Sequence, residues 1–124
     1  MISMMRPADK ETSQRIVQRY GLRARDPEKT EYWACEWGMI GLEEMRPGIY
    51  EIVSWVVHEP CRRQGRGGSL LTFALREAIK KEAAEIYIAT DTLGVYEKVF
   101  GFELLGDRTA FRETEKKVYV KRLH

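Results

Sequence analysis

The sequence predicts a mixed α/β fold, in which strands and amphipathic helices alternate along the chain. The segment from Ile49 to Val57 is rich in β-branched and aromatic residues and is apolar on both faces, as a central strand requires. A helix is predicted after Pro60, because apolar residues recur in steps of three and four from Leu70 to Ile79. Glu85 to Thr90 is predicted to be a second buried strand. This order implies a right-handed crossover and a parallel or splayed pair of strands.

The first part of the chain is predicted to contain a short strand and a helix. Ser3 to Ala8 is the predicted strand, and Thr12 to Tyr20 is the predicted helix, which Gly21 ends with a left-handed stop. Arg23 to Glu31 is polar and is predicted to be a loop or an irregular second helix.

A hairpin and three closing elements complete the prediction. Tyr32 to Glu36 and Met39 to Glu43 are two strand-like runs on either side of Trp37-Gly38, which is the pattern of a hairpin. The C-terminal part is predicted to contain one helix and two strands: a helix from Asp91 or Thr92 to about Phe100, and strands over Phe102 to Leu105 and Lys116 to Leu123.

Length and charge limit the possible functions. With 124 residues the chain is long enough for one hydrophobic core, so residues 1–124 are predicted to form a single domain. Lys and Arg number 21 against 19 for Asp and Glu, which gives a formal net charge of +2. A net charge this small argues against a polyanion-binding surface as the main function.

Neither a membrane span nor a metal site is expected from the sequence. No apolar run approaches the ~18 residues that a spanning helix needs, and Met1 to Met5 is too short for a signal peptide, so we expect a cytoplasmic protein. Cys35 and Cys61 occur in neither CxxC nor Cys/His spacing. We therefore expect two reduced thiols, with no disulfide framework and no structural zinc.

The turn from Arg62 to Gly68 is the best candidate for a binding site, because three glycines and three arginines precede the predicted helix there. Unpaired N–H groups and the positive end of the helix dipole bind phosphate where glycines let the backbone close around it. A solvated turn with solubilising arginines is the alternative. The position between an apolar strand and an amphipathic helix favours a ligand site. The turn matches neither GxxxxGK[ST] nor GxGxxG.

Three blocks of the sequence resemble a known family. Arg62-Arg63-Gln64-Gly65-Arg66-Gly67 is similar to the [Q/R]-x-x-G-x-[G/A] signature of the GNAT superfamily of N-acetyltransferases. Val53 to Val57 resembles the fourth strand of that fold, and the segment from Tyr96 to Phe102 resembles its late YEK...GF segment. The resemblance implies a mixed, splayed sheet of six or seven strands flanked by three to four helices. The strands of Val53 and Ile88 would part to admit the cofactor.

The resemblance also implies a co-substrate, acetyl-CoA, and the residues that bind it. The backbone of the glycine-rich turn would hold the pyrophosphate of CoA, through Arg62, Arg63, Gln64, Gly65, Arg66, Gly67 and Gly68, with Ser69 close by. The main chain of Trp55, Val56 and Val57 would pair with the pantetheine arm as an added strand would. The N–H of Val57 would face the thioester oxygen, as in an oxyanion hole.

Two residues are candidates for catalysis. Glu51 stands where the histone-acetyltransferase branch of the superfamily has its general base, which an amine needs because it arrives as ammonium. A strand-end glutamate in solvent, with ordered water as the base, is the alternative. Tyr96 stands where relatives protonate the departing thiolate, and a packing tyrosine is the alternative. Relatives often carry an Asn before this Tyr, whereas Thr90 to Val95 has none and is shortened, which puts that pantetheine contact in doubt.

The predicted function is an N-acetyltransferase that transfers the acetyl group of acetyl-CoA to a primary amine by direct attack in a ternary complex. The acceptor is a small-molecule or a peptide or protein amine, and a homodimer is compatible with the resemblance. A non-catalytic CoA-binding sensor of the same fold is one alternative. A nucleic-acid-binding domain is another, and the near-neutral charge and the lack of aromatic residues among Arg62, Arg63 and Arg66 argue against it.

Overall fold

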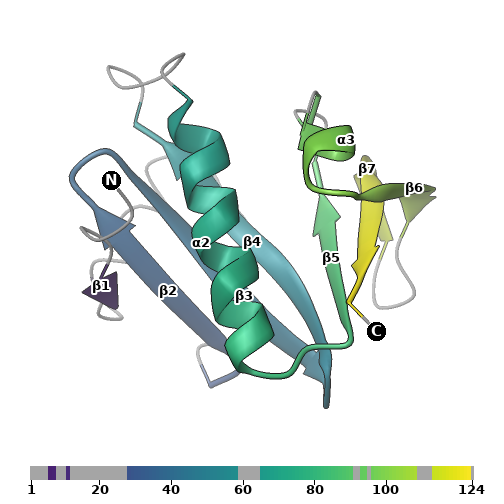
Figure 1. Ribbon diagram of the computed structural model, residues 1–124, viewed down its shortest axis with the longest axis horizontal. Helices are drawn as coiled ribbons and strands as arrows, with labels where there is room; N and C mark the ends of the chain where they lie inside the picture. Colours follow the sequence, from purple (N-terminus) through teal and green to yellow (C-terminus); the bar gives the residue numbers. More distant parts are fainter. Residues whose placement is uncertain are drawn as a thin grey trace.

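The computed structural model describes residues 6–7, 11, 28–58, 65–90, 93–94, 96–108 and 113–123. These residues include a seven-stranded sheet with the order β1-β2-β3-β4-β5-β7-β6 (Figure 1). The elements in chain order are β1 (Arg6–Pro7), β2 (Thr30–Cys35), β3 (Gly38–Arg46), β4 (Ile49–Val57), α2 (Arg66–Lys80), β5 (Glu85–Ala89), α3 (Tyr96–Val99), β6 (Glu103–Arg108) and β7 (Glu113–Arg122). The predicted mixed sheet of six or seven strands is confirmed.

The strand that begins the hairpin starts earlier than predicted. Thr30 and Glu31 belong to β2, not to a loop or helix, because they pair with residues of β3. β2 then pairs antiparallel with β3 as far as Cys35 and Gly38, which confirms the predicted hairpin. Of the predicted first strand, Arg6–Pro7 is described and pairs with β2, whereas the predicted helix from Thr12 to Tyr20 lies outside the described residues.

The C-terminal elements also differ in length from the prediction. α3 covers four residues, Tyr96–Val99, and Gly94 lies in a turn with φ +54° before it. The predicted helix start at Asp91 or Thr92 lies outside the described residues. β6 and β7 are both longer than predicted and pair antiparallel with each other, and β7 also pairs with β5.

Helix α2 connects two parallel strands, β4 and β5, as predicted. Figure 1 shows α2 lying across β2, β3 and β4. Its buried side chains recur at helical spacing and form one face: Leu70, Leu71, Ala74, Leu75 and Ala78. They pack into one hydrophobic core with side chains of the sheet: Ile40, Leu42, Ile52, Ile86 and Ile88. None of the helices in the described ranges is long and apolar enough to span a membrane.

The C-terminal end of α2 is closed by a Schellman motif, in which backbone N–H groups bond back to the last turn. The N–H of Ala83 donates to the carbonyl oxygen of Ala78 at 3.1 Å, and the N–H of Glu82 donates to that of Ile79 at 3.0 Å. Glu82 has a φ of +59°, at the position where such motifs usually have glycine. The backbone groups at the end of α2 are therefore hydrogen-bonded, but the backbone of Glu82 is locally strained.

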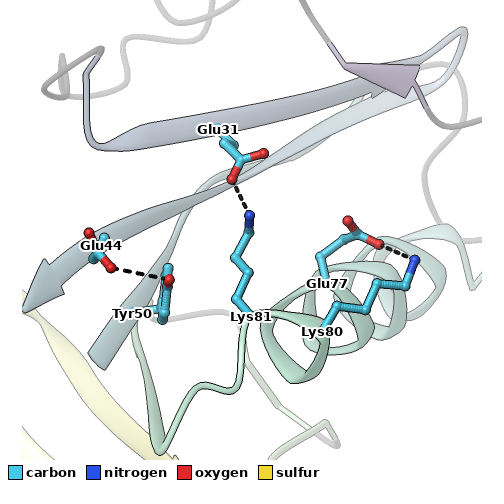
Figure 2. Close-up of polar contacts among 6 residues, drawn as sticks. All are labelled: Glu31, Glu44, Tyr50, Glu77, Lys80 and Lys81. Atoms are coloured by element: carbon cyan, nitrogen blue, oxygen red, sulfur yellow. Dashed lines mark hydrogen bonds and ion pairs between the residues drawn. The ribbon is translucent and has the colours of Figure 1, made fainter. Parts of the chain in front are cut away.

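Two polar contacts lie near the same end of α2, one between the helix end and β2 and one between β4 and β3 (Figure 2). Lys81 forms an ion pair with Glu31 of β2, and this hydrogen bond raises the pKa of Lys81. The hydroxyl of Tyr50 donates to Glu44 Oε2 at 3.2 Å. Burial is the main cause that raises the pKa of Tyr50, and the Glu44 carboxylate adds to it. These groups lie at the opposite end of α2 from the glycine-rich turn, so we assign them a role in stabilising the fold and none in the candidate site.

The sheet has a second buried face, opposite α2. Ile52 points into the core with α2, so its neighbours Glu51 and Val53 point to the other face, because side chains alternate along a strand. Glu51 lies directly across the β3–β4 ladder from Glu43. Both carboxylates are buried, with exposed fractions of 1% and 8%.

β4 and β5 separate part of the way along their length. Their parallel pairing begins at Ile49 and ends where Ile52 meets Ile88. β4 continues beyond that point paired with β3 as far as Val57, and the N–H of His58 donates to the carbonyl oxygen of Trp37 at 2.8 Å. Figure 1 shows the two strands adjacent at their starts and diverging toward their ends. The predicted splay is confirmed.

A β-bulge marks the divergence. The register of β3 and β4 shifts between two pairs of residues: Met39 with Val56, and Gly41 with Val53. Between these pairs, Ile40 of β3 faces both Ser54 and Trp55 of β4. Ser54 has a φ of +52°, in the left-handed region. An extra residue bends and twists a strand locally, so the bulge gives a physical reason for β4 to leave β5.

Candidate cofactor site and active site

Helix α2 begins in the glycine-rich turn. Gly65 is the N-cap residue with a φ of +72°, and its carbonyl oxygen accepts a hydrogen bond from the N–H of Ser69 at 3.3 Å. The first turn, from Arg66 to Ser69, contains no acidic residue. This helix start therefore carries uncompensated positive dipole charge. Arg62, Arg63 and Gln64, the other predicted pyrophosphate ligands, lie outside the described residues.

Two of the predicted phosphate-binding glycines lie against aromatic rings. A Cβ atom added to Gly67 would lie 3.4 Å from Cζ2 of Trp55 and 3.7 Å from the hydroxyl oxygen of Tyr96. A Cβ atom added to Gly68 would lie 3.0 Å from Cε1 of Tyr96, which is tighter than most Cβ contacts in proteins. Glycine at position 68 therefore lets α3 approach the start of α2, whereas a Cβ at position 67 would make only ordinary van der Waals contacts. Gly65 is needed for its backbone conformation, since no atom lies within 4 Å of a Cβ added there.

Three rings form an aromatic cluster beside this helix start: Trp55, Tyr96 and Phe100. The indole N–H of Trp55 donates to the carbonyl oxygen of Gly67 at 3.0 Å. The rings of Trp55 and Tyr96 have centroids 5.8 Å apart, and those of Tyr96 and Phe100 are 5.9 Å apart. Tyr96 begins α3 and Phe100 directly follows it, and the N–H of Phe100 donates to the carbonyl oxygen of Tyr96 at 3.0 Å, so one helical turn places both rings on the same side. The aromatic cluster joins β4, α2 and α3 where β4 has left β5.

The side chain of Arg66 points to the β2–β3 hairpin. Its guanidinium carbon lies 5.0 Å from the centroid of the Trp37 ring, within the range of a cation–π contact. Trp37 is buried, with 8% of its surface exposed. The backbone of Arg66 is therefore part of the glycine-rich turn, while its side chain contacts Trp37 in the β2–β3 hairpin.

Glu51 and Tyr96 lie on different faces of the sheet. Tyr96 contacts α2 through Gly68, whereas Glu51 faces away from α2, across from Glu43. The alternative interpretation of Glu51 as a glutamate in solvent is wrong, because only 1% of its surface is exposed. As far as Ile52, β4 and β5 are paired, and the sheet lies between the side chains of Glu51 and Tyr96. Beyond Ile52 the two strands no longer pair, so the sheet no longer separates its two faces there.

Sequence reasoning missed two residues of this region: Glu43 and Ser54. Ser54 is the only polar residue between Glu51 and His58, and that interruption of an apolar run was a usable signal. Glu43 is brought opposite Glu51 by the pairing of β3 with β4, which the sequence does not specify locally. Cys35 is a free thiol, as predicted, and Cys61 lies outside the described residues.

The fold is that of acyl-CoA-binding acetyltransferases with known structures. An acetyltransferase from Bacillus subtilis in complex with CoA has a TM-score of 0.69 and 19% identity, covering 97% of this chain and 98% of the other. A GNAT family acetyltransferase from Elizabethkingia anophelis with acetyl-CoA bound has a TM-score of 0.69 and 16% identity, covering 96% and 97%.

A longer protein shares the fold as well. The N-acetylglutamate synthase from Neisseria gonorrhoeae, complexed with coenzyme A and N-acetyl-glutamate, has a TM-score of 0.70 and 16% identity. The match covers 97% of this chain and spans only 35% of the synthase. No curated protein sequence gives a significant match.

The family follows from the sequence itself. The model of the acetyltransferase (GNAT) family matches residues 4–102. The chain therefore belongs to the GNAT family of acetyltransferases, which supports acyl transfer as its general activity.

Proposed function

We propose that this protein transfers the acetyl group of acetyl-CoA to a primary amine in a ternary complex. The single observation that carries the proposal is the end of β4–β5 pairing at Ile52 and Ile88, beyond which Trp55 of β4 contacts the glycine-rich start of α2 at Gly67. Such an opening offers a strand edge to an extended ligand and a helix start to its phosphates. Known structures of this fold that contain CoA or acetyl-CoA support the same choice.

The proposed cofactor site combines backbone groups from β4 and α2. Trp55, Val56 and Val57 pair with the pantetheine arm through their main chain. The pyrophosphate lies at the turn formed by Arg62, Arg63, Gln64, Gly65, Arg66, Gly67 and Gly68, near Ser69. Because Trp55 and Tyr96 lie in contact, we expect the arm to separate their rings as it enters.

The proposed chemistry uses the two faces of the sheet. The amine gives a proton to Glu51 from one face, its nitrogen bonds to the thioester carbon, and the carbon–sulfur bond breaks. Tyr96 then gives a proton to the thiolate of CoA from the other face. Attack on the thioester carbon forms a tetrahedral intermediate that carries both nitrogen and sulfur, so the base acts on one substituent and the acid on another. Ordered water is the alternative base.

The acceptor is proposed only as a primary amine of a small molecule, peptide or protein. The complex of N-acetylglutamate synthase with N-acetyl-glutamate supports an amine acceptor for this fold. The single domain, the cytoplasmic location, the lack of a metal and a homodimer stay predictions.

A non-catalytic CoA sensor is the second candidate. The complete burial of Glu51 favours it, since a base must reach its substrate. Release of CoA from acetyl-CoA, followed with a thiol reagent across polyamines, amino acids and peptide N-termini, separates the two candidates. We expect amine-dependent release with at least one class of acceptor. Acetyl-CoA binding with no release above hydrolysis for any amine would favour the sensor.

A further inference from the structure

Ser54 is a residue of β4 that the proposed chemistry does not use. It lies in the β-bulge with a φ of +52° and is buried, with 8% of its surface exposed. Its Oγ atom makes no hydrogen bond within the part of the chain that the structure describes. Two unfavourable features therefore coincide at one residue.

Packing gives no reason for serine at this position. A left-handed backbone strains any residue with a Cβ atom, whereas glycine adopts it freely. A buried hydroxyl without a partner is destabilising because it loses its hydrogen bonds to water. Glycine would remove both penalties and keep the bulge. Strained and unsatisfied polar residues concentrate where a protein contacts a ligand.

The position of Ser54 identifies that ligand. Ser54 lies two residues beyond Ile52, the last residue of β4 that pairs with β5. The next residue, Trp55, contacts both Tyr96 and Gly67 of the candidate site. Ser54 thus lies on β4 between Glu51, the proposed base, and Trp55 to Val57, the segment proposed to pair with pantetheine. Here β4 no longer pairs with β5.

We propose that the Ser54 hydroxyl donates a hydrogen bond to a carbonyl oxygen of the acyl-pantetheine arm of acyl-CoA. This inference rests on the proposed function. The thioester and the amides of pantetheine all offer carbonyl acceptors, and a serine hydroxyl is a donor to either. An arm that enters between β4 and β5 passes beside Ser54, where β4 no longer pairs with β5, and supplies the partner that the buried hydroxyl lacks.

The proposal predicts opposite effects of one substitution on stability and on affinity. Ser54→Ala removes the unpaired hydroxyl, and Ser54→Gly also removes the strain. We expect the melting temperature of the ligand-free protein to stay the same or rise in Ser54→Ala and to be higher still in Ser54→Gly. Both variants lose the hydrogen bond to acyl-CoA, so acetyl-CoA should bind about tenfold more weakly, which is ~1.4 kcal/mol.

Calorimetric titration with acetyl-CoA and with CoA, combined with melting curves of the same samples, tests the proposal. Thr72→Val is the matched control, because the Thr72 hydroxyl donates to the Gly68 carbonyl oxygen within α2 at 2.9 Å. We expect this variant to bind both ligands as the parent does. A loss confined to acetyl-CoA assigns the bond to the thioester carbonyl, and an equal loss with CoA assigns it to a pantetheine amide.

The outcomes separate this inference from the proposed function. If the parent binds acetyl-CoA and both Ser54 variants bind both ligands within twofold of the parent, the inference on Ser54 is wrong and the proposed function stands. If the folded parent binds neither ligand, the proposed function is wrong, and the inference falls with it.

Discussion

The ring and the hydroxyl of Tyr96 have separable roles. The ring packs between Trp55 and Phe100, and the hydroxyl is the proposed acid. Tyr96→Phe keeps the ring, so we expect the melting temperature and acetyl-CoA affinity to change little. The turnover number should fall ~10²-fold, or ~2.7 kcal/mol in activation free energy, because a positioned acid is lost.

Single-turnover kinetics should be used for this comparison, since product release can hide a slower chemical step. Tyr50→Phe is the matched control, because its hydroxyl bonds to Glu44 at the far end of α2. A rate for Tyr96→Phe within about threefold of the parent, ~0.7 kcal/mol, would make Tyr96 a packing residue only.

The opposed carboxylates of Glu51 and Glu43 allow a matched test of the base. Each substitution by Gln replaces one carboxyl group of the same buried pair by an amide of similar size, so their effects on stability should be similar. Glu51→Gln should lower the rate most at low pH, where the acceptor is ammonium and a base is most needed. Glu43→Gln should follow the pH–rate profile of the parent. If the pH–rate profile of Glu51→Gln coincides with that of the parent, Glu51 has a structural role only, or water accepts the proton of the amine.

Site residues that belong to a local sequence motif were predicted, whereas those whose position depends on the pairing of strands were missed. Gly67 and Tyr96 were found because the motifs around them are local, and the structure brings them together. Ser54 interrupts an apolar run, but the bulge there was missed because it depends on how β4 aligns with β3. The face that Glu51 occupies likewise follows from the packing of its neighbour Ile52 against α2.

At the scale of elements, the strain at the end of α2 gives a test of stability. Glu82 occupies the left-handed position of a Schellman motif with φ +59°. Glu82→Gly should stabilise the protein by about 1 kcal/mol and raise the melting temperature by a few degrees, since glycine adopts this backbone without strain. Arg76→Gly, at an exposed site within α2, should destabilise it by about 1 kcal/mol. A lower melting temperature for Glu82→Gly would contradict the assigned motif.

Elements with strong periodicity were predicted well, and polar ones were not. β4, α2 and β5 were located correctly because their apolar patterns are dense and distinct. The start of β2 at Thr30 was missed, since Thr30 and Glu31 are polar and become strand only by pairing with β3. α3 is shorter than its pattern suggested, because Gly94 lies in a turn before Tyr96.

At the scale of the whole molecule, the order of the strands could not be predicted from the residues. β7 lies between β5 and β6 in the sheet. The last strand of the chain is therefore an inner strand, and β6, which precedes it in sequence, lies at the edge. Non-local pairing of this kind leaves no local pattern in the sequence. The order strand, helix, strand left open whether β4 and β5 are parallel or splayed, the resemblance to a family implied the splay, and the bulge at Ser54 gives it a physical cause.

The glycine at position 67 connects this architecture to cofactor binding. Gly67→Val would place its Cβ in ordinary contact with Trp55 and its methyl groups beside the start of α2. We expect the variant to fold and to lose acetyl-CoA affinity, because the added side chain blocks backbone approach to the pyrophosphate. Circular dichroism checks the fold, and calorimetry measures the affinity. Parent-like affinity in Gly67→Val would put the phosphate site elsewhere.

The melting temperature of the parent protein with and without acetyl-CoA tests the central claim most directly. A ligand that binds only the folded state at a hundred times its dissociation constant stabilises it by ~2.7 kcal/mol, which raises the melting temperature of a domain this size by several degrees. We predict such a rise with acetyl-CoA. A folded sample whose melting temperature is unchanged by millimolar acetyl-CoA would contradict the assignment of the gap between β4 and β5 as an acyl-CoA site.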